Sequence, residues 1–97
     1  MDDQALARAL DIMLKQWPRT FHCNDIVDFI DRGAKGTAAE LRALFYPNSS
    51  PDEGITTPYS VGHLLNHCAD RSVRLGDRTL ILRRYKHGRW PTYAVHD

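Results

Sequence analysis

The spacing of the apolar residues changes once along this chain, and that change restricts the fold more than any other feature of the sequence. From Asp3 to Trp17, and again from Pro58 to Cys68, apolar residues recur every three or four positions, which is typical of one face of a helix. The run from Arg78 to Tyr85 is instead rich in strand formers. Helices that precede strands predict a single α+β domain, with three to four helices followed by a C-terminal β-hairpin.

Local signals place the ends of the first helices. Pro18 is expected to end the first helix, because its ring restricts the preceding residue and removes a donor from the helix ladder. The β-prone residues Thr20 to His22 follow as a short extended link. Asn24 is then expected to cap a second helix from Asp25 to Asp31.

A third, short helix is predicted after a turn. Gly33 and Gly36 are expected to close the second helix and open that turn. Thr37-Ala38-Ala39-Glu40 has the spacing of a capping box and predicts a helix from Thr37 to Phe45. The many turn formers between Tyr46 and Ile55 indicate an exposed connecting loop.

The last helix and the hairpin follow that loop. Thr57 is expected to cap the helix, whose apolar face comprises Val61, Leu64, Leu65 and Cys68. Lys86-His87-Gly88-Arg89 is expected to reverse the chain between the strand Arg78 to Tyr85 and a second strand, Trp90 to Val95. Pro91 lacks an N–H donor, so this second strand is predicted to lie at the edge of the sheet.

Charge is divided unevenly between the two halves of the chain. Residues 1–56 hold six basic and nine acidic side chains, a net charge of −3, whereas residues 57–97 hold seven basic and three acidic ones, a net charge of +4. Such an asymmetry indicates that a polyanion faces one side of the molecule.

The order helix, short strand, helix, helix, strand, strand resembles the winged-helix superfamily. The resemblance is carried by Ser60-Val61-Gly62-His63-Leu64-Leu65, which leads through Val73-Arg74-Leu75-Gly76-Asp77 to a basic hairpin that ends Tyr93-Ala94-Val95. The resemblance implies that the helix Thr57 to Cys68 enters the major groove of duplex DNA as a recognition helix. It also implies that Tyr85 to Trp90 form the tip of a wing that contacts phosphates.

The chain departs from this architecture before the recognition helix. Winged-helix domains often have a tight turn there, whereas this chain has the predicted helix Thr37 to Phe45 and a long loop. Either that helix or the helix Asp25 to Asp31 is therefore expected to pack across the recognition helix.

Charge and resemblance together indicate which side chains contact nucleic acid. Polar residues outside the apolar face of the recognition helix are suited to base edges, and an Asn can pair bidentately with adenine. Cations on a short hairpin can reach phosphates while they stay solvated. The candidate residues are Tyr59, Ser60, His63, Asn66 and His67 on the helix and Arg71, Arg74, Arg83, Arg84, Lys86, His87 and Arg89 beyond it.

Simpler interpretations exist for both groups, because any amphipathic helix has a polar face and cations also protect edge strands from aggregation. Among the aromatic residues, Tyr59 and Trp90 can stack on unpaired bases near a basic surface. The other large aromatic residues expected in the core are Trp17, Phe21, Phe29 and Phe45.

Several other classes of site and protein find little support. His63 and His67 have a metal-binding spacing, but no Cys-x-x-Cys or second His pair completes a zinc site, so we predict no metal and no cofactor. The phosphate-loop, nucleophile-elbow and zinc-protease signatures are absent, and the chain is not expected to be an enzyme. Reduced thiols are expected at Cys23 and Cys68. No apolar run approaches a membrane span, and the acidic N-terminus differs from a secretory signal, so a cytoplasmic location is expected.

The sequence therefore predicts a small bacterial or phage regulator of transcription or replication that binds duplex DNA. A protein-interaction domain is the alternative, in which a basic partner docks on the acidic first half, comprising Asp2, Asp3, Asp11, Asp25, Asp28 and Asp31. A homodimer is physically reasonable as well, because two copies would read a symmetric DNA site.

Overall fold

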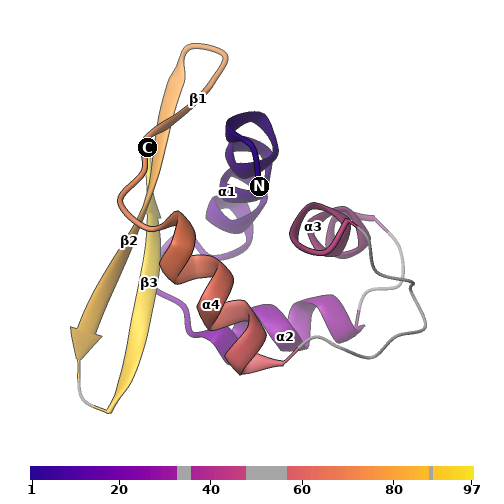
Figure 1. The fold of residues 1–97 in the computed structure, drawn as a ribbon, viewed down its shortest axis with the longest axis vertical. Helices are drawn as coiled ribbons and strands as arrows, with labels where there is room; N and C mark the ends of the chain where they lie inside the picture. The colour runs from indigo at the N-terminus through magenta and orange to yellow at the C-terminus, as the bar shows by residue number, and fades with distance from the viewer. Residues whose placement is uncertain (33–35, 48–56, 88) are drawn as a thin grey trace.

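A computed structural model of the chain describes residues 1–32, 36–47, 57–87 and 89–97. Within these residues, four helices precede a three-stranded antiparallel sheet with the strand order β1-β2-β3 (Figure 1). The elements are α1 (Asp3–Gln16), α2 (Cys23–Arg32), α3 (Thr37–Phe45), α4 (Pro58–Cys68), β1 (Val73–Leu75), β2 (Arg78–His87) and β3 (Trp90–His96). The predicted α+β class is confirmed, and the sheet has one strand more than the predicted hairpin. No described helix is long and apolar enough to cross a membrane.

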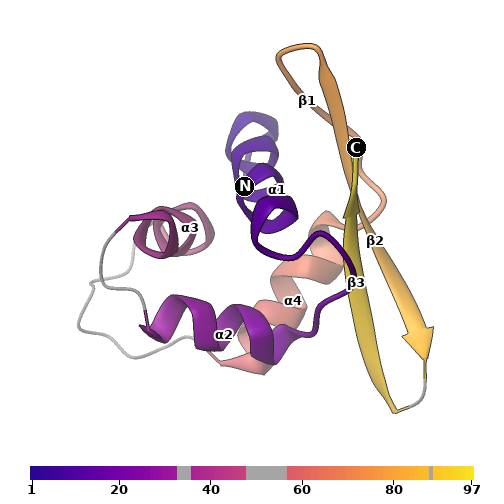
Figure 2. The same cartoon turned by 180° about the vertical axis from the view of Figure 1, so that it is seen from behind.

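The first helix, α1, lies between α3 and the sheet (Figure 2) and contacts all three strands. Its N-terminus is capped by Asp2, whose carboxylate accepts a hydrogen bond of 2.7 Å from a backbone N–H of the first turn. Leu6, Leu10 and Met13 share one face and are fully buried. The helix ends one residue earlier than predicted, with Trp17 as its C-cap.

The segment between α1 and α2 joins the helices to the sheet. Phe21 and Tyr93 of β3 form a bridge, in which the N–H of each donates to the carbonyl of the other at 2.8 Å. The predicted short strand from Thr20 to His22 is thus reduced to one paired residue. The Phe21 ring is buried, with its centroid 5.2 Å from that of Trp17 and 6.1 Å from that of Tyr93.

The N-terminus of α2 differs from the prediction. The helix begins at Cys23, so the predicted N-cap, Asn24, lies inside its first turn. The carboxylate of Asp25 instead reaches back and accepts a hydrogen bond of 2.8 Å from the backbone N–H of His22. This bond satisfies a donor next to the helix that has no partner in the helix ladder.

The predicted capping box of α3 is also wrong. Gly36 is the N-cap, with a φ of +72° that costs a glycine little, and Thr37 is already helical with no side-chain cap among the described residues. Glu40 forms an ion pair with Arg8 of α1, so it fastens α3 to α1 and does not close a box. Gly33 and the greater part of the predicted loop, residues 48–55, lie outside the described residues.

β2 and β3 form the predicted hairpin with a tighter reversal than expected. The strands remain paired up to His87 opposite Trp90, although the sequence predicts a turn from Lys86 onward. β3 lies at one edge of the sheet, as Pro91 predicts. The hairpin end projects past the helices, at the lower left of Figure 1.

The strand β1 was not predicted. Val73–Leu75 pairs with the start of β2 around a turn in which Gly76 has a φ of +61°. Three residues are too few to show the alternation by which a strand is recognised from sequence, and β1 is held by its contacts with α1 and β2.

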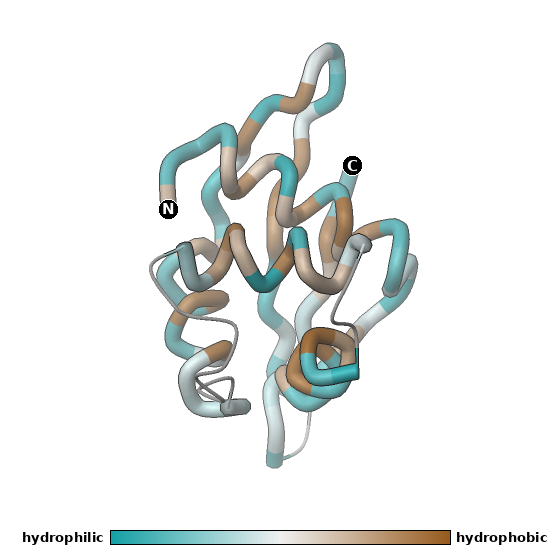
Figure 3. Tube along the Cα trace, turned by 90° about the vertical axis from the view of Figure 1, so that its right-hand side faces the viewer, coloured by the Kyte–Doolittle hydropathy of each residue, from teal (hydrophilic) through white to brown (hydrophobic). Residues whose placement is uncertain are grey.

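The apolar face of α4 forms part of the core, as predicted. Val61, Leu65 and Cys68 are buried, and Leu64 packs against them while partly exposed. α2 packs across α4, whereas α3 packs on α1 and α2, so α2 is the partner of α4 among the two candidates that the sequence left open. Hydrophobic residues recur along the helices and the middle of the sheet, while the hairpin end is hydrophilic to neutral (Figure 3).

A partly exposed ion pair between Arg78 of β2 and Asp11 of α1 links the sheet to α1. Nη1 of Arg78 donates to Oδ1 of Asp11 at 2.8 Å, and Nζ of Lys15 lies 3.1 Å from the other carboxylate oxygen. Burial raises the pKa of Asp11, but the hydrogen bonds from Arg78 and Lys15 outweigh it, so the pKa lies below the ordinary value of 3.8. Asp11 therefore adds stability above its ordinary pKa, and that stability is lost as the pH falls through the lowered pKa.

We expect Asp11→Asn to destabilise the fold more at pH 7 than at pH 2.5, because the wild-type carboxylate takes up a proton, and loses its ion pairs, as the pH falls through its lowered pKa. Urea denaturation of both proteins at the two pH values measures the difference in the free energy of unfolding. An equal loss at both pH values would show that the charge of Asp11 contributes nothing.

Candidate nucleic-acid interface

α4 presents most of the predicted base-contacting residues away from its apolar face. Thr57 caps the helix as predicted, since its Oγ1 accepts a hydrogen bond of 3.1 Å from the backbone N–H of Ser60. The cap starts the helix in a register that turns Val61 and Leu65 inward. The exposed candidates are Tyr59, His63, Asn66 and His67, and Ser60 is partly buried.

Two of the polar side chains of α4 bond to residues outside the helix. Oγ of Ser60 lies 2.7 Å from the hydroxyl of Tyr46, so this side chain faces the segment after α3. Oδ1 of Asn66 accepts a hydrogen bond of 3.0 Å from the hydroxyl of Tyr93. The Asn66 amide nitrogen has no partner among the described residues and can donate to a ligand.

The basic side chains of the second half fall into two groups. The first group is paired with carboxylates, in the pairs Arg71–Asp3, Arg78–Asp11, Arg78–Asp97 and Arg83–Asp70. No carboxylate of the described residues lies within ion-pair distance of the second group, which comprises Arg74, Arg84, Lys86 and Arg89. Two predicted phosphate ligands, Arg71 and Arg83, are therefore engaged inside the chain.

Arg84 and Lys86 lie on the side of the hairpin that faces the helices. In the register of the hairpin, Arg84 is opposite Tyr93 and Lys86 is opposite Pro91. Residues directly opposite one another in a sheet share a face, and Tyr93 is buried against α4 and Phe21. Both cations nevertheless remain exposed, because the hairpin end projects past the helices.

The two other cations of the second group, Arg89 and Arg74, lie toward opposite ends of the sheet. The guanidinium carbon of Arg89 lies 5.6 Å from the centroid of the Trp90 ring, in a cation–π contact at the hairpin end. Arg74 lies in β1, toward the opposite end of the sheet (Figure 1). The side chain of His87 is outside the part of the chain that the structure describes.

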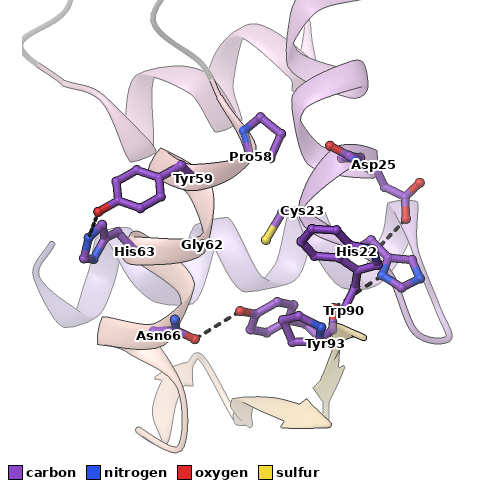
Figure 4. Close-up of a pocket in the computed structure, with 12 residues that line it drawn as sticks. His22, Cys23, Asp25, Pro58, Tyr59, Gly62, His63, Asn66, Trp90 and Tyr93 are labelled. Carbon is purple, nitrogen blue, oxygen red and sulfur yellow. Dashed lines mark hydrogen bonds between the residues drawn. The ribbon is translucent and has the colours of Figure 1, made fainter. Parts of the chain in front are cut away.

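A pocket of about 720 Å³ separates α4 from the hairpin (Figure 4). The sequence predicts exposure for its α4 residues. It gives no sign that residues near 22 and near 91 meet there, because tertiary contacts such as the Phe21–Tyr93 bridge bring them together. The lining comprises Tyr59, Gly62, His63 and Asn66 with Pro58 from α4, His22, Cys23, Asn24 and Asp25 at the start of α2, and Trp90, Pro91 and Tyr93 from β3.

The titratable groups on the floor of this pocket are held neutral. Burial raises the pKa of the Cys23 thiol and of the Tyr93 hydroxyl, and the charge of Arg84 offsets each shift only in part. Cys23 is therefore a thiol at neutral pH and a poor nucleophile. Arg84 lies opposite Tyr93 in the register of the hairpin, so the two residues share one face of the sheet.

The histidines and cysteines do not form a metal centre in the part of the chain that the structure describes, where no group of three or more His, Cys, Asp or Glu side chains could hold an ion. His63 lines the pocket with His22 and Cys23, but His67 and Cys68 do not. Both cysteines are free thiols, and Cys68 is buried in the core.

The acidic side chains of the first half have mainly structural partners. Asp2 caps α1 and Asp25 bonds to the backbone before α2. Asp3 and Asp11 form ion pairs with basic residues of the second half. The uneven charge of the sequence is thus partly neutralised by contacts between the two halves.

Comparison of the chain with protein-family models, with curated proteins and with solved structures finds no match.

Proposed function

We propose that this chain is a winged-helix-like domain that binds duplex DNA, with α4 in the major groove and the β2–β3 hairpin on the phosphates. The order of the elements supports this proposal. The chain follows the winged-helix order of α1, the paired residue Phe21, α2, α4 and the hairpin. The helix α3 is inserted before α4. α2 packs across α4, which is the arrangement expected of the two helices of a helix-turn-helix.

One observation carries the proposal: three cations with no carboxylate partner among the described residues lie on a hairpin that projects beside the polar face of α4. Arg84, Lys86 and Arg89 are exposed, and no described carboxylate lies within ion-pair distance of them. Phosphate contacts release counterions from DNA only where a cation is available to replace them. A guanidinium such as that of Arg83 would first have to leave its own carboxylate.

Base contacts would come from α4, because a B-DNA major groove is wide enough to admit a helix. His63 and His67 project from its exposed face, and the Asn66 amide nitrogen can donate to a base acceptor. Such contacts would provide specificity, whereas the hairpin would provide affinity that does not depend on sequence.

The alternative, a basic protein partner on the acidic first half, has less support. Asp2, Asp3, Asp11 and Asp25 are engaged in caps or ion pairs within the chain. Docking a basic partner on them would compete with contacts that hold the fold together.

The test is fluorescence anisotropy of a labelled, mixed-sequence 20-base-pair duplex, titrated with the protein at several salt concentrations. Three phosphate contacts predict that log K falls linearly with log[salt] with a slope of about −2.7. Absence of binding at low salt, or affinity that does not change with salt, would overturn the proposal.

A further inference from the structure

The pocket between α4 and β3 exposes two large aromatic side chains to solvent. Tyr59 is 78% exposed and Trp90 is 67% exposed. They lie on opposite sides of the pocket, with Cys23 and Tyr93 between them (Figure 4). Single exposed apolar side chains are common on protein surfaces. Two large aromatic side chains exposed around one pocket instead indicate a site for a ligand.

Both rings are held in place before any ligand arrives. The Tyr59 ring meets the His63 ring edge-on, with centroids 4.9 Å apart and an interplanar angle of 89°, and its hydroxyl lies 3.2 Å from Nε2 of His63. Trp90 carries the guanidinium of Arg89 over its ring. A planar ligand would therefore meet rings whose motion is already restricted.

The polar groups around the rings favour a ligand with two parts. One is a neutral, planar group inside the pocket, and the other is a negatively charged group beside it. The Asn66 amide nitrogen can donate into the pocket. The His22 ring is oriented by a contact of 3.3 Å between its Nδ1 and the carbonyl oxygen of Pro91. Among the described residues that line the pocket, Asp25 has the only carboxylate, and it accepts from the backbone N–H of His22. Arg84, which lies opposite Tyr93 in the register of the hairpin, adds positive charge on the same face of the sheet.

We propose that this pocket binds one unpaired nucleobase, stacked on Trp90 and Tyr59, while Arg84 and Lys86 contact the neighbouring phosphates. A base in a single strand has the required planar face and carries phosphates on both sides. The inference rests on the proposed nucleic-acid function and deepens it: the domain prefers DNA in which a duplex adjoins unpaired bases.

The experiment compares a blunt duplex with a forked duplex of the same paired length that carries short unpaired thymidine tails. Wild-type protein is expected to bind the fork about tenfold more tightly, the effect of one stacked base. Trp90→Ala and, separately, Tyr59→Ala are each expected to bring the ratio of the two affinities close to one. Both side chains are exposed, so neither substitution removes a core contact. Tyr59→Ala tests the opposite side of the pocket if Trp90→Ala is poorly folded.

Tryptophan fluorescence provides an independent readout and a matched control. In Trp17→Phe, which removes the tryptophan that packs on Phe21 and Phe29, Trp90 is the only remaining tryptophan, and excitation at its long-wavelength edge avoids the tyrosines. Its emission should be quenched by the fork and by a thymidine oligonucleotide, and this variant should keep the wild-type affinity ratio.

The outcomes separate the two proposals. Salt-dependent binding of both DNAs with equal affinity, and no quenching of Trp90, would overturn the base pocket and leave duplex binding intact. Binding of the fork alone, with quenching, would support the pocket and overturn duplex binding. Binding of neither DNA would overturn both.

Discussion

The triple variant Arg84→Ala/Lys86→Ala/Arg89→Ala is expected to bind duplex DNA about a hundredfold more weakly than the wild type at 0.1 M salt. Each lost phosphate contact removes about 0.9 from the slope of log K against log[salt], so the slope should become nearly flat. The three side chains are exposed and form no ion pair with a described carboxylate, so their removal should leave the fold intact. Anisotropy across the salt series measures both quantities.

Two controls show whether position or total charge is responsible. Arg19→Ala/Arg32→Ala/Lys35→Ala removes the same charge from the first half of the chain and should leave the slope unchanged. Arg83→Ala should have a smaller effect than Arg84→Ala, because Arg83 is 2.7 Å from a carboxylate oxygen of Asp70. If both triple variants lose affinity equally, total charge and not the position of the hairpin cations determines binding.

Phe21→Ala is expected to lower the free energy of unfolding by about 3–5 kcal/mol, the usual cost of removing a fully buried phenyl ring. Phe21 is 1% exposed, packs between the rings of Trp17 and Tyr93, and pairs its backbone with β3. The resulting cavity would lie where the segment between α1 and α2 is attached to the sheet. Domains of this size are stable by about 5–15 kcal/mol, so the loss is a large share of the total.

Phe29→Ala is the matched control, because this ring also packs on Trp17, at 5.4 Å between centroids, but is only half-buried. Phe29→Ala should lower the free energy of unfolding clearly less than Phe21→Ala does. Thermal or urea denaturation of both variants and the wild type measures the difference. Equal losses would mean that Phe21 has no special role in joining helices to sheet. Because Phe21 also positions His22 and Cys23, the variant should weaken fork preference at temperatures where it is still folded.

The elements that the sequence predicted well depend on neighbours within one or two turns. Thr57 caps α4, and its inward face follows from residues three and four apart. Pro91 lies in an edge strand because a proline has no backbone N–H to donate to a second neighbouring strand. The errors at Asn24 and Thr37 are local too: another group, Asp25 or Gly36, serves the same helix end.

The candidate site was predicted only in part, for a related reason. The sequence by itself determined that cations gather in the last third of the chain and that α4 has a polar face, since both follow from composition and periodicity. Only the tertiary structure decided which cations have no carboxylate partner among the described residues, because Asp3 and Asp11 reach Arg71 and Arg78 across most of the chain length. It also decided that His22 meets Pro91 beside Trp90, because contacts between residues so far apart depend on how whole elements pack.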